Sequence, residues 1–108
     1  MLKIKLYWTP FALKSLDEIK SYIEKETYSE VIAVNYINKV INRVEQLQNF
    51  PESGQEEVLL KPLNQNSRYL IEGSYKIIYQ YIDNKVIVTD VFHVMQNPSR
   101  IQRSNKRK

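Results

Sequence analysis

The hydrophobic period of this 108-residue chain changes near its middle, from the spacing of helices to the spacing of strands. Through residues 12–47, apolar residues recur at steps of three and four, which places them on one face of a helix. Across residues 68–94 the pattern has a period near two, which is typical of half-buried strands. A chain of this length fits one domain, so both halves share one core. The pattern predicts an α+β fold, with residues 1–108 as a single domain.

Two amphipathic helices joined by a short link are predicted for the first half. Alternation over residues 2–6 predicts a strand before them. Thr9 and Pro10 predict the start of the first helix, because threonine caps helices and proline fits the first turn. Ser29 predicts the start of the second helix, which ends before Pro51. Because so few residues join the helices, we expect an antiparallel helical hairpin. The inner stripes are Ala12, Leu16, Ile19 and Ile23, then Ala33, Ile37, Val40, Val44 and Leu47.

Three strands and two tight turns are predicted for the second half. Segments 68–72, 75–82 and 85–94 are rich in Tyr, Ile and Val, which favour strands. Turn-forming residues separate them at 72–74 and 83–84, so the strands form an antiparallel meander. The expected fold is an N-terminal strand and an antiparallel helical hairpin packed on one face of an antiparallel β-sheet, in the order β-α-α-β-β-β.

The turn at residues 83–84 predicts which side chains share a face of the sheet. A two-residue loop pairs Ile82 with Lys85. If that register continues, Lys76 and His93 lie together on the open face, away from the helices. The same register places Tyr75, Ile77, Tyr79, Tyr81, Val86, Val88, Asp90 and Phe92 under the helices.

The face that Arg68 occupies depends on the preceding turn. A two-residue turn at Gly73-Ser74 puts Arg68 on the helix face, whereas a three-residue turn over 72–74 puts it on the open face. Because an unpaired buried arginine costs free energy, we expect the three-residue turn. Glu56 and Glu57 could provide a general base, but adjacent acids in a loop are usually solvated.

Composition excludes several classes of site. The chain has no cysteine and one histidine, His93, which excludes thiolate ligands and clusters of histidine ligands for zinc. We therefore expect no metal and no cofactor. No apolar run approaches the roughly 20 residues of a membrane span, and none near the N-terminus suits a signal peptide. We expect a cytoplasmic protein without a membrane partner.

The positive charge is concentrated in a basic tail at residues 99–108. The chain has 16 Lys+Arg and 12 Asp+Glu, for a net charge of +4. Five of the bases, including Arg100 and Arg103, lie in this tail, which has no acid. Such a tail is either a solvated end or an electrostatic contact with nucleic acid or an acidic partner.

Several short motifs occur in a distinctive order. They are Trp8-Thr9-Pro10, Phe50-Pro51 with Gly54, Arg68, the segment 73–79, then Val91-Phe92-His93 followed by Met95, Asn97-Pro98 and Arg100. In this order they resemble the ParE/RelE superfamily of toxins from type II toxin–antitoxin systems, closer to ParE-like members. The resemblance covers residues from about Ile4 to Ile101 and implies the same helical hairpin over a sheet.

The resemblance implies two competing activities. ParE-like toxins poison DNA gyrase without a known catalytic residue set, whereas RelE-like toxins cut messenger RNA on the ribosome. If the chain is a nuclease, the catalytic candidates are Arg68 and Lys76 as phosphate-neutralising cations and His93 as acid or base. Few cations occur between residues 52 and 94, and this favours the ParE-like reading. A degenerate member of the family, or a plain binding module whose only partner is another protein, is the third alternative.

All these readings imply a cognate antitoxin as partner and a toxin–antitoxin hetero-oligomer. Antitoxins typically cover the toxin with an extended or helical segment. DNA gyrase is the second expected partner, and the ribosome with its messenger RNA is the alternative. The candidate partner-binding residues are Arg68, Lys76, His93, Met95, Asn97, Arg100 and Arg103.

Overall fold

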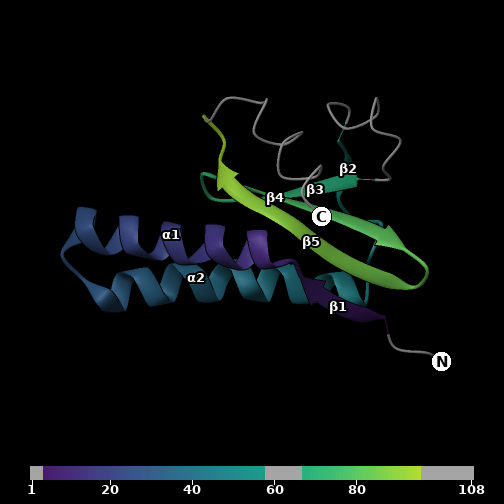
Figure 1. Cartoon of the computed structure of the whole chain (residues 1–108), viewed down its shortest axis with the longest axis horizontal. Helices are drawn as coiled ribbons and strands as arrows, with labels where there is room; N and C mark the ends of the chain where they lie inside the picture. Colours follow the sequence, from purple (N-terminus) through teal and green to yellow (C-terminus); the bar gives the residue numbers. More distant parts are fainter. Residues whose placement is uncertain (1–3, 58–66, 96–108) are drawn as a thin grey trace.

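The computed structural model describes residues 4–57 and 67–95 and confirms the α+β class. Two helices form an antiparallel hairpin on one side of a five-stranded sheet, and the closed end of the hairpin extends beyond the sheet (Figure 1). The elements are β1 (Lys5–Trp8), α1 (Pro10–Thr27), α2 (Glu30–Glu45), the 3-10 turn η1 (Gln46–Gln48), β2 (Gln55–Glu56), β3 (Ser67–Glu72), β4 (Tyr75–Ile82) and β5 (Lys85–His93). Within the described residues, no helix is long and apolar enough to span a bilayer.

Both helices begin where their capping residues predict. The Thr9 hydroxyl accepts a hydrogen bond from the backbone N–H of Ala12 at 3.1 Å, and Pro10 is the first residue of α1. The Ser29 hydroxyl accepts from the N–H of Ile32 at 3.1 Å. Between the helices, Tyr28 has a left-handed φ of 54°, which reverses the chain.

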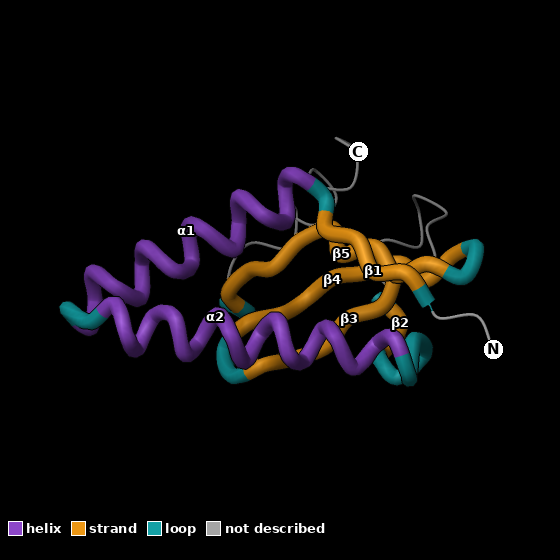
Figure 2. The backbone as a smooth tube through the Cα atoms, turned by 90° about the horizontal axis from the view of Figure 1, so that it is seen from below, coloured by secondary structure: helices purple, strands orange, loops and turns teal. Residues whose placement is uncertain are grey.

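The predicted apolar stripes form most of the helix side of the core. All their residues are buried except Ile37, which is partly buried. They pack on strand residues of the same sheet face, and α2 crosses that face beside β3 (Figure 2). The strand residues of this cluster are Leu70, Tyr75, Ile77, Tyr79, Val86, Val88 and Val91.

The sheet is mixed, not purely antiparallel as predicted. Its strand order is β1-β5-β4-β3-β2, and β1 runs parallel to β5, with Leu6 opposite Val86. A parallel neighbour requires a long crossover connection. Here the helical hairpin and three intervening strands provide it. The other pairs are antiparallel.

The two hairpin turns differ in how well they were predicted. Asp83 and Asn84 both have left-handed φ, 51° and 60°, and the pairing of Ile82 with Lys85 is confirmed. The three-residue turn predicted at 72–74 is wrong. Glu72 pairs directly with Tyr75, and the two-residue turn begins with Gly73 at a φ of 60°. A glycine is favoured there because it adopts this φ without a steric penalty.

A β-bulge overturns the predicted register of β4 and β5. Tyr79 pairs with Val88, but the preceding residue of β4, Ile78, pairs with Asp90, so Thr89 is the extra residue. Beyond the bulge, Val91, Phe92 and His93 change face relative to the uninterrupted register, whereas Asp90 stays on the helix side as predicted and bonds there to Ser15. Val91 therefore packs in the helix-side core. Phe92, predicted under the helices, joins Ile78 and Tyr69 in a second cluster on the opposite face.

Candidate functional site

The three candidate catalytic residues do not form one site. The prediction that Lys76 and His93 share the open face is wrong, because the bulge turns His93 towards the helices. The prediction that Arg68 lies on that face is also wrong, since Arg68 pairs with Tyr79 of the helix-side core. Each of the three has its own set of contacts.

Arg68 holds the loop before β2. Its Nη1 donates to the carbonyl oxygens of Gly54 at 2.9 Å and Glu52 at 3.2 Å. Its Nη2 lies 3.8 Å from a carboxylate oxygen of Glu52. These partners explain how an arginine is accommodated on this side of the sheet, because loop carbonyls accept hydrogen bonds from its Nη1 and the Glu52 carboxylate lies near its Nη2. Arg68 is therefore engaged within the chain.

The loop that Arg68 holds is also fastened to Tyr79. The Tyr79 hydroxyl donates to the Pro51 carbonyl at 2.8 Å and accepts from the Gly54 N–H at 2.9 Å. The Tyr79 side chain is fully buried, and burial raises its pKa above the ordinary value of 10.0, although the Gly54 N–H and Arg68 lower it. Tyr79 and Arg68 together close this end of the sheet.

Lys76 is paired with a buried carboxylate. Its Nζ lies 2.5 Å from Glu57 Oε2 and 4.1 Å from the centre of the Tyr69 ring. The expectation that Glu57 is solvated is wrong, because only 2% of its side chain is exposed. The Glu57 backbone N–H donates to the Ser67 carbonyl at 2.8 Å, which holds Glu57 beside β3. An ion pair this well buried is more typical of a structural contact than of a lysine that is available to bind phosphate.

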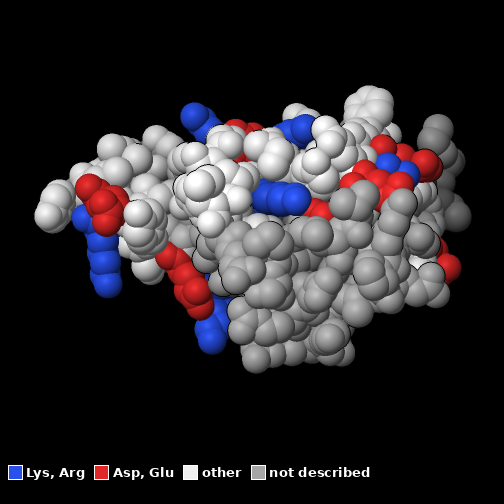
Figure 3. Space-filling model, turned by 90° about the horizontal axis from the view of Figure 1, so that it is seen from above, with Lys and Arg blue, Asp and Glu red and all other residues white. Residues whose placement is uncertain are grey.

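The charges on one face of the molecule are mixed in sign. On the face shown in Figure 3, Lys and Arg are interspersed with Asp and Glu, and no broad area of one sign appears among the described residues. An RNA-binding surface generally concentrates cations along one groove or face. Within the described residues no group of His, Cys, Asp or Glu could hold a metal ion.

His93 lies at the end of β5, on the side of the helices. Its ring meets the Tyr75 ring edge to face, with centroids 5.5 Å apart. Its Nδ1 accepts a hydrogen bond from the backbone N–H of Met95 at 3.2 Å. These two contacts of His93 involve neither Lys76 nor Arg68.

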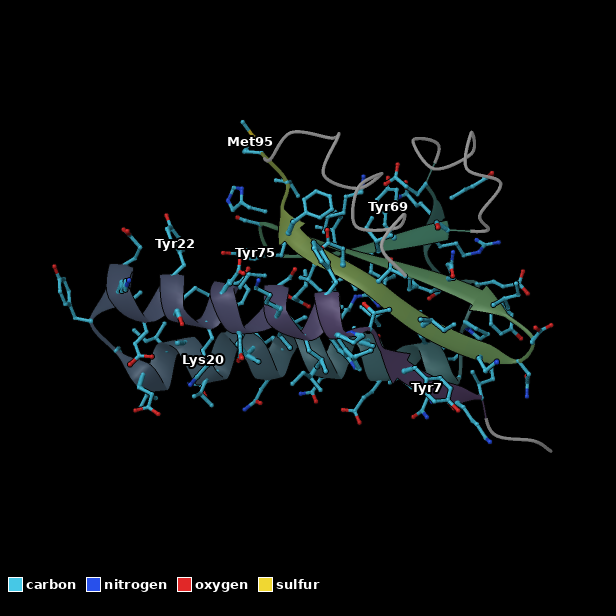
Figure 4. All side chains as sticks on the ribbon, in the orientation of Figure 1. Tyr7, Lys20, Tyr22, Tyr69, Tyr75 and Met95 are labelled. Atoms are coloured by element: carbon cyan, nitrogen blue, oxygen red, sulfur yellow. The ribbon has the colours of Figure 1, made fainter. Side chains whose placement is uncertain are left out.

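A groove of about 380 Å³ opens between α1 and the ends of β4 and β5. Its lining includes Glu18, Tyr22, Tyr75, Val91, His93 and Met95. Tyr22 rises from α1, Tyr75 lies between the helix and the sheet, and Met95 lies above them at the end of β5 (Figure 4). Tyr22 is 58% exposed and Met95 is 84% exposed, so both are accessible to a partner.

Sequence reasoning singled out His93 and Met95 but not this groove. The bulge brings the end of β5 to α1, and nothing in the local alternation of β5 indicates it. The sequence does contain one signal of this contact between α1 and β5. Ser15 is a polar residue on the inner face of α1, and Asp90 is an acidic residue in an apolar strand, and the two are hydrogen-bonded. Asn97, Arg100 and Arg103 lie outside the described residues.

Comparisons with known proteins agree with this architecture. Residues 6–98 match the family model for the ParE toxin of type II toxin–antitoxin systems, parDE. No curated protein matches the sequence. A solved structure of the chromosomal ParDE toxin–antitoxin system from P. aeruginosa is similar in fold, with a TM-score of 0.70 and 17% identity, and the match covers 85% of this chain and 97% of that chain. Since the family model spans most of the sequence, this chain belongs to the ParE toxin family of type II toxin–antitoxin systems.

Proposed function

We propose that this ParE-family toxin inhibits DNA gyrase by binding it, without catalysing a reaction of its own, and that a cognate antitoxin neutralises it. Cleavage of RNA needs an acid or base and cations within reach of one phosphate. Arg68 is hydrogen-bonded to the Gly54 carbonyl, and Lys76 is paired with Glu57. His93 lies on the helix side of the sheet, and Lys76 lies on the other side. This dispersal is the observation that carries the proposal.

The family membership supports an antitoxin as partner, and the similar solved structure is described as a ParDE toxin–antitoxin system. We expect the antitoxin gene beside the gene of this toxin. Its product should copurify with the toxin as a hetero-oligomer. A gyrase target also implies that the toxin acts in the cytoplasm.

The test is a supercoiling assay with purified gyrase and a titration of toxin. An inhibitor that acts by binding should reach full inhibition near a fixed ratio of toxin to gyrase, and longer incubation should not lower that ratio. Addition of the neighbouring gene product should restore supercoiling. Full gyrase activity at a large excess of folded toxin would contradict the proposal.

A parallel measurement addresses cleavage directly. Primer extension on messenger RNA from translating ribosomes should reveal no toxin-dependent cuts. If cuts appear, a Lys76→Met and Glu57→Leu double variant removes the candidate cation without leaving its buried partner charged. Loss of cutting in that variant, with its fold intact, would establish a nuclease and overturn the binding mechanism.

A further inference from the structure

The groove between α1 and the end of β5 combines negative charge with aromatic rings. Glu18 lies at its rim, and the rings of Tyr22, Tyr75 and His93 contribute to its walls. Among the described residues that line it, none is Lys or Arg. A cation is attracted both by carboxylates and by the faces of aromatic rings.

A second carboxylate lies directly behind the wall of this groove. Asp90 is fully buried, and its Oδ1 accepts hydrogen bonds from the Ser15 hydroxyl at 3.0 Å and from the Val91 N–H at 2.8 Å. Ser15 itself lines the groove. The hydrogen bond to Ser15 of α1 places the Asp90 carboxyl group on the helix side of the sheet, behind the groove.

The rest of the lining suits a long aliphatic stem. Ile19, Val91 and Met95 present apolar surface beside the rings. Arginine carries an apolar stem and a planar guanidinium that stacks on aromatic rings and forms forked hydrogen bonds to carboxylates. Lysine provides charge but neither the planar stacking nor the fork.

We propose that this groove binds an arginine side chain of the antitoxin, with the guanidinium among the tyrosine rings and Glu18 and the stem against Met95. The inference rests on the proposed antitoxin partner. It adds the position on the toxin and the chemistry that the partner must present there. The volume of about 380 Å³ accommodates one such side chain with part of its backbone.

The first test uses a small probe in place of the antitoxin. N-acetyl-arginine methylamide is titrated into the full-length toxin and followed by NMR, with N-acetyl-citrulline methylamide as the neutral isostere. We expect the arginine probe to shift the Met95 methyl and the Tyr22 and His93 ring signals. The citrulline probe should bind at least about tenfold more weakly. Equal binding of the two probes, or shifts confined to other residues, would overturn the proposal.

Two variants of α1 distinguish a direct contact between the probe and Glu18 from an effect of the net charge of the protein. Glu18→Gln should weaken binding of the arginine probe by about two- to fivefold, as expected for a solvent-accessible charge pair. Asp17→Asn is the matched control, because Asp17 is an exposed neighbour on α1 that does not line the groove. It should leave the affinity unchanged within error. A loss as large in Asp17→Asn as in Glu18→Gln would mean that only net charge matters, which contradicts a specific site.

The last measurement connects the probe site to the antitoxin. The copurified product of the neighbouring gene should displace the arginine probe. The chemical shift of the Met95 methyl group should then no longer depend on the concentration of the probe. An antitoxin that neutralises the toxin while the probe stays bound would overturn the arginine site and leave the proposed function standing. An absence of any neutralising partner would instead count against the proposed function, whatever the probe does.

Discussion

Two tyrosines on the same face of β4 are surrounded in different ways. Tyr75 and Tyr79 are four residues apart, both pack in the helix-side core, and burial raises the pKa of both above 10.0. The Tyr79 hydroxyl exchanges hydrogen bonds with the backbone of Pro51 and Gly54. Tyr75 instead contacts the rings of Tyr36 and His93 and borders the groove.

The difference separates an end of the sheet that is closed by contacts within the chain from an end that is proposed to bind a partner. At the Tyr79 end, Arg68 and the tyrosine hydroxyl satisfy loop backbone groups from within the chain. At the Tyr75 end, the rings and Glu18 border a hollow that a partner can fill. Substitutions at the first end should therefore act on stability, and substitutions at the second should act on binding.

Gly54→Ala should produce the largest loss of stability. An added Cβ would lie 2.5 Å from the Tyr79 hydroxyl oxygen and 2.8 Å from the Tyr69 backbone oxygen. Because a strand backbone cannot easily move, we expect a loss of about 3 kcal/mol in the free energy of unfolding, measured by urea denaturation. Ser53→Ala, an exposed neighbour, is the control and should change stability by less than about 0.5 kcal/mol. A Gly54→Ala protein as stable as that control would show that this end is not tightly closed.

Tyr79→Phe should have the next largest effect. The variant keeps the buried ring but removes the hydroxyl that is hydrogen-bonded to the Pro51 carbonyl and the Gly54 N–H. Leaving these backbone groups without that partner should cost about 2 kcal/mol, read from the same denaturation curves. Near-ultraviolet circular dichroism should confirm that the fold is kept. A change under about 0.5 kcal/mol would mean that water replaces the hydroxyl, and that the loop is open to solvent.

Alkaline pH should lower the stability of the fold through the phenol groups of Tyr75 and Tyr79. Their folded pKa values are raised by burial, so above about pH 10 the unfolded chain releases protons that the folded chain retains. The contribution is fully present below that pH and is lost as pH rises through the folded pKa values. Denaturation at about pH 8 and about pH 11 measures the loss. Tyr79→Phe should show a smaller loss than the parent chain, and an equal loss would argue against Tyr79 as a contributor.

Tyr75→Phe should have the smallest effect on stability. Its contacts with Tyr36 and His93 are ring contacts, which phenylalanine retains. We expect a change of less than about 0.5 kcal/mol in the free energy of unfolding. The arginine probe should still bind, because the ring face remains. If this variant lost as much stability as Tyr79→Phe, the contrast between the two ends of the strand would not hold.

Local sequence signals predicted the helices and one turn correctly. Thr9 and Ser29 cap where expected, the inner stripes are buried, and Asp83 and Asn84 form the two-residue turn. Each of these depends on residues close together in the chain. The family motifs agree with the match over residues 6–98.

The candidate site was predicted less well, because its position depends on distant pairings. A single extra residue at Thr89 moves His93 to the helix side. The preference for placing Arg68 on the open face failed because carbonyl partners from residues 52 and 54 were not foreseen. Glu57 is buried because β4 supplies Lys76 as its partner.

The sequence by itself determined the α+β class, the helical hairpin and the membership of a toxin family. Periodicity and caps are properties of neighbouring residues, and the order of the motifs is read directly along the chain. Only the tertiary structure decided the direction of β1, the side of the sheet on which His93 lies, and the partners of Arg68 and Lys76. The physical reason is that strand alternation defines faces only while the register is unbroken. Hydrogen bonds such as that between Ser15 and Asp90, 75 residues apart, stabilise a register that no local pattern encodes.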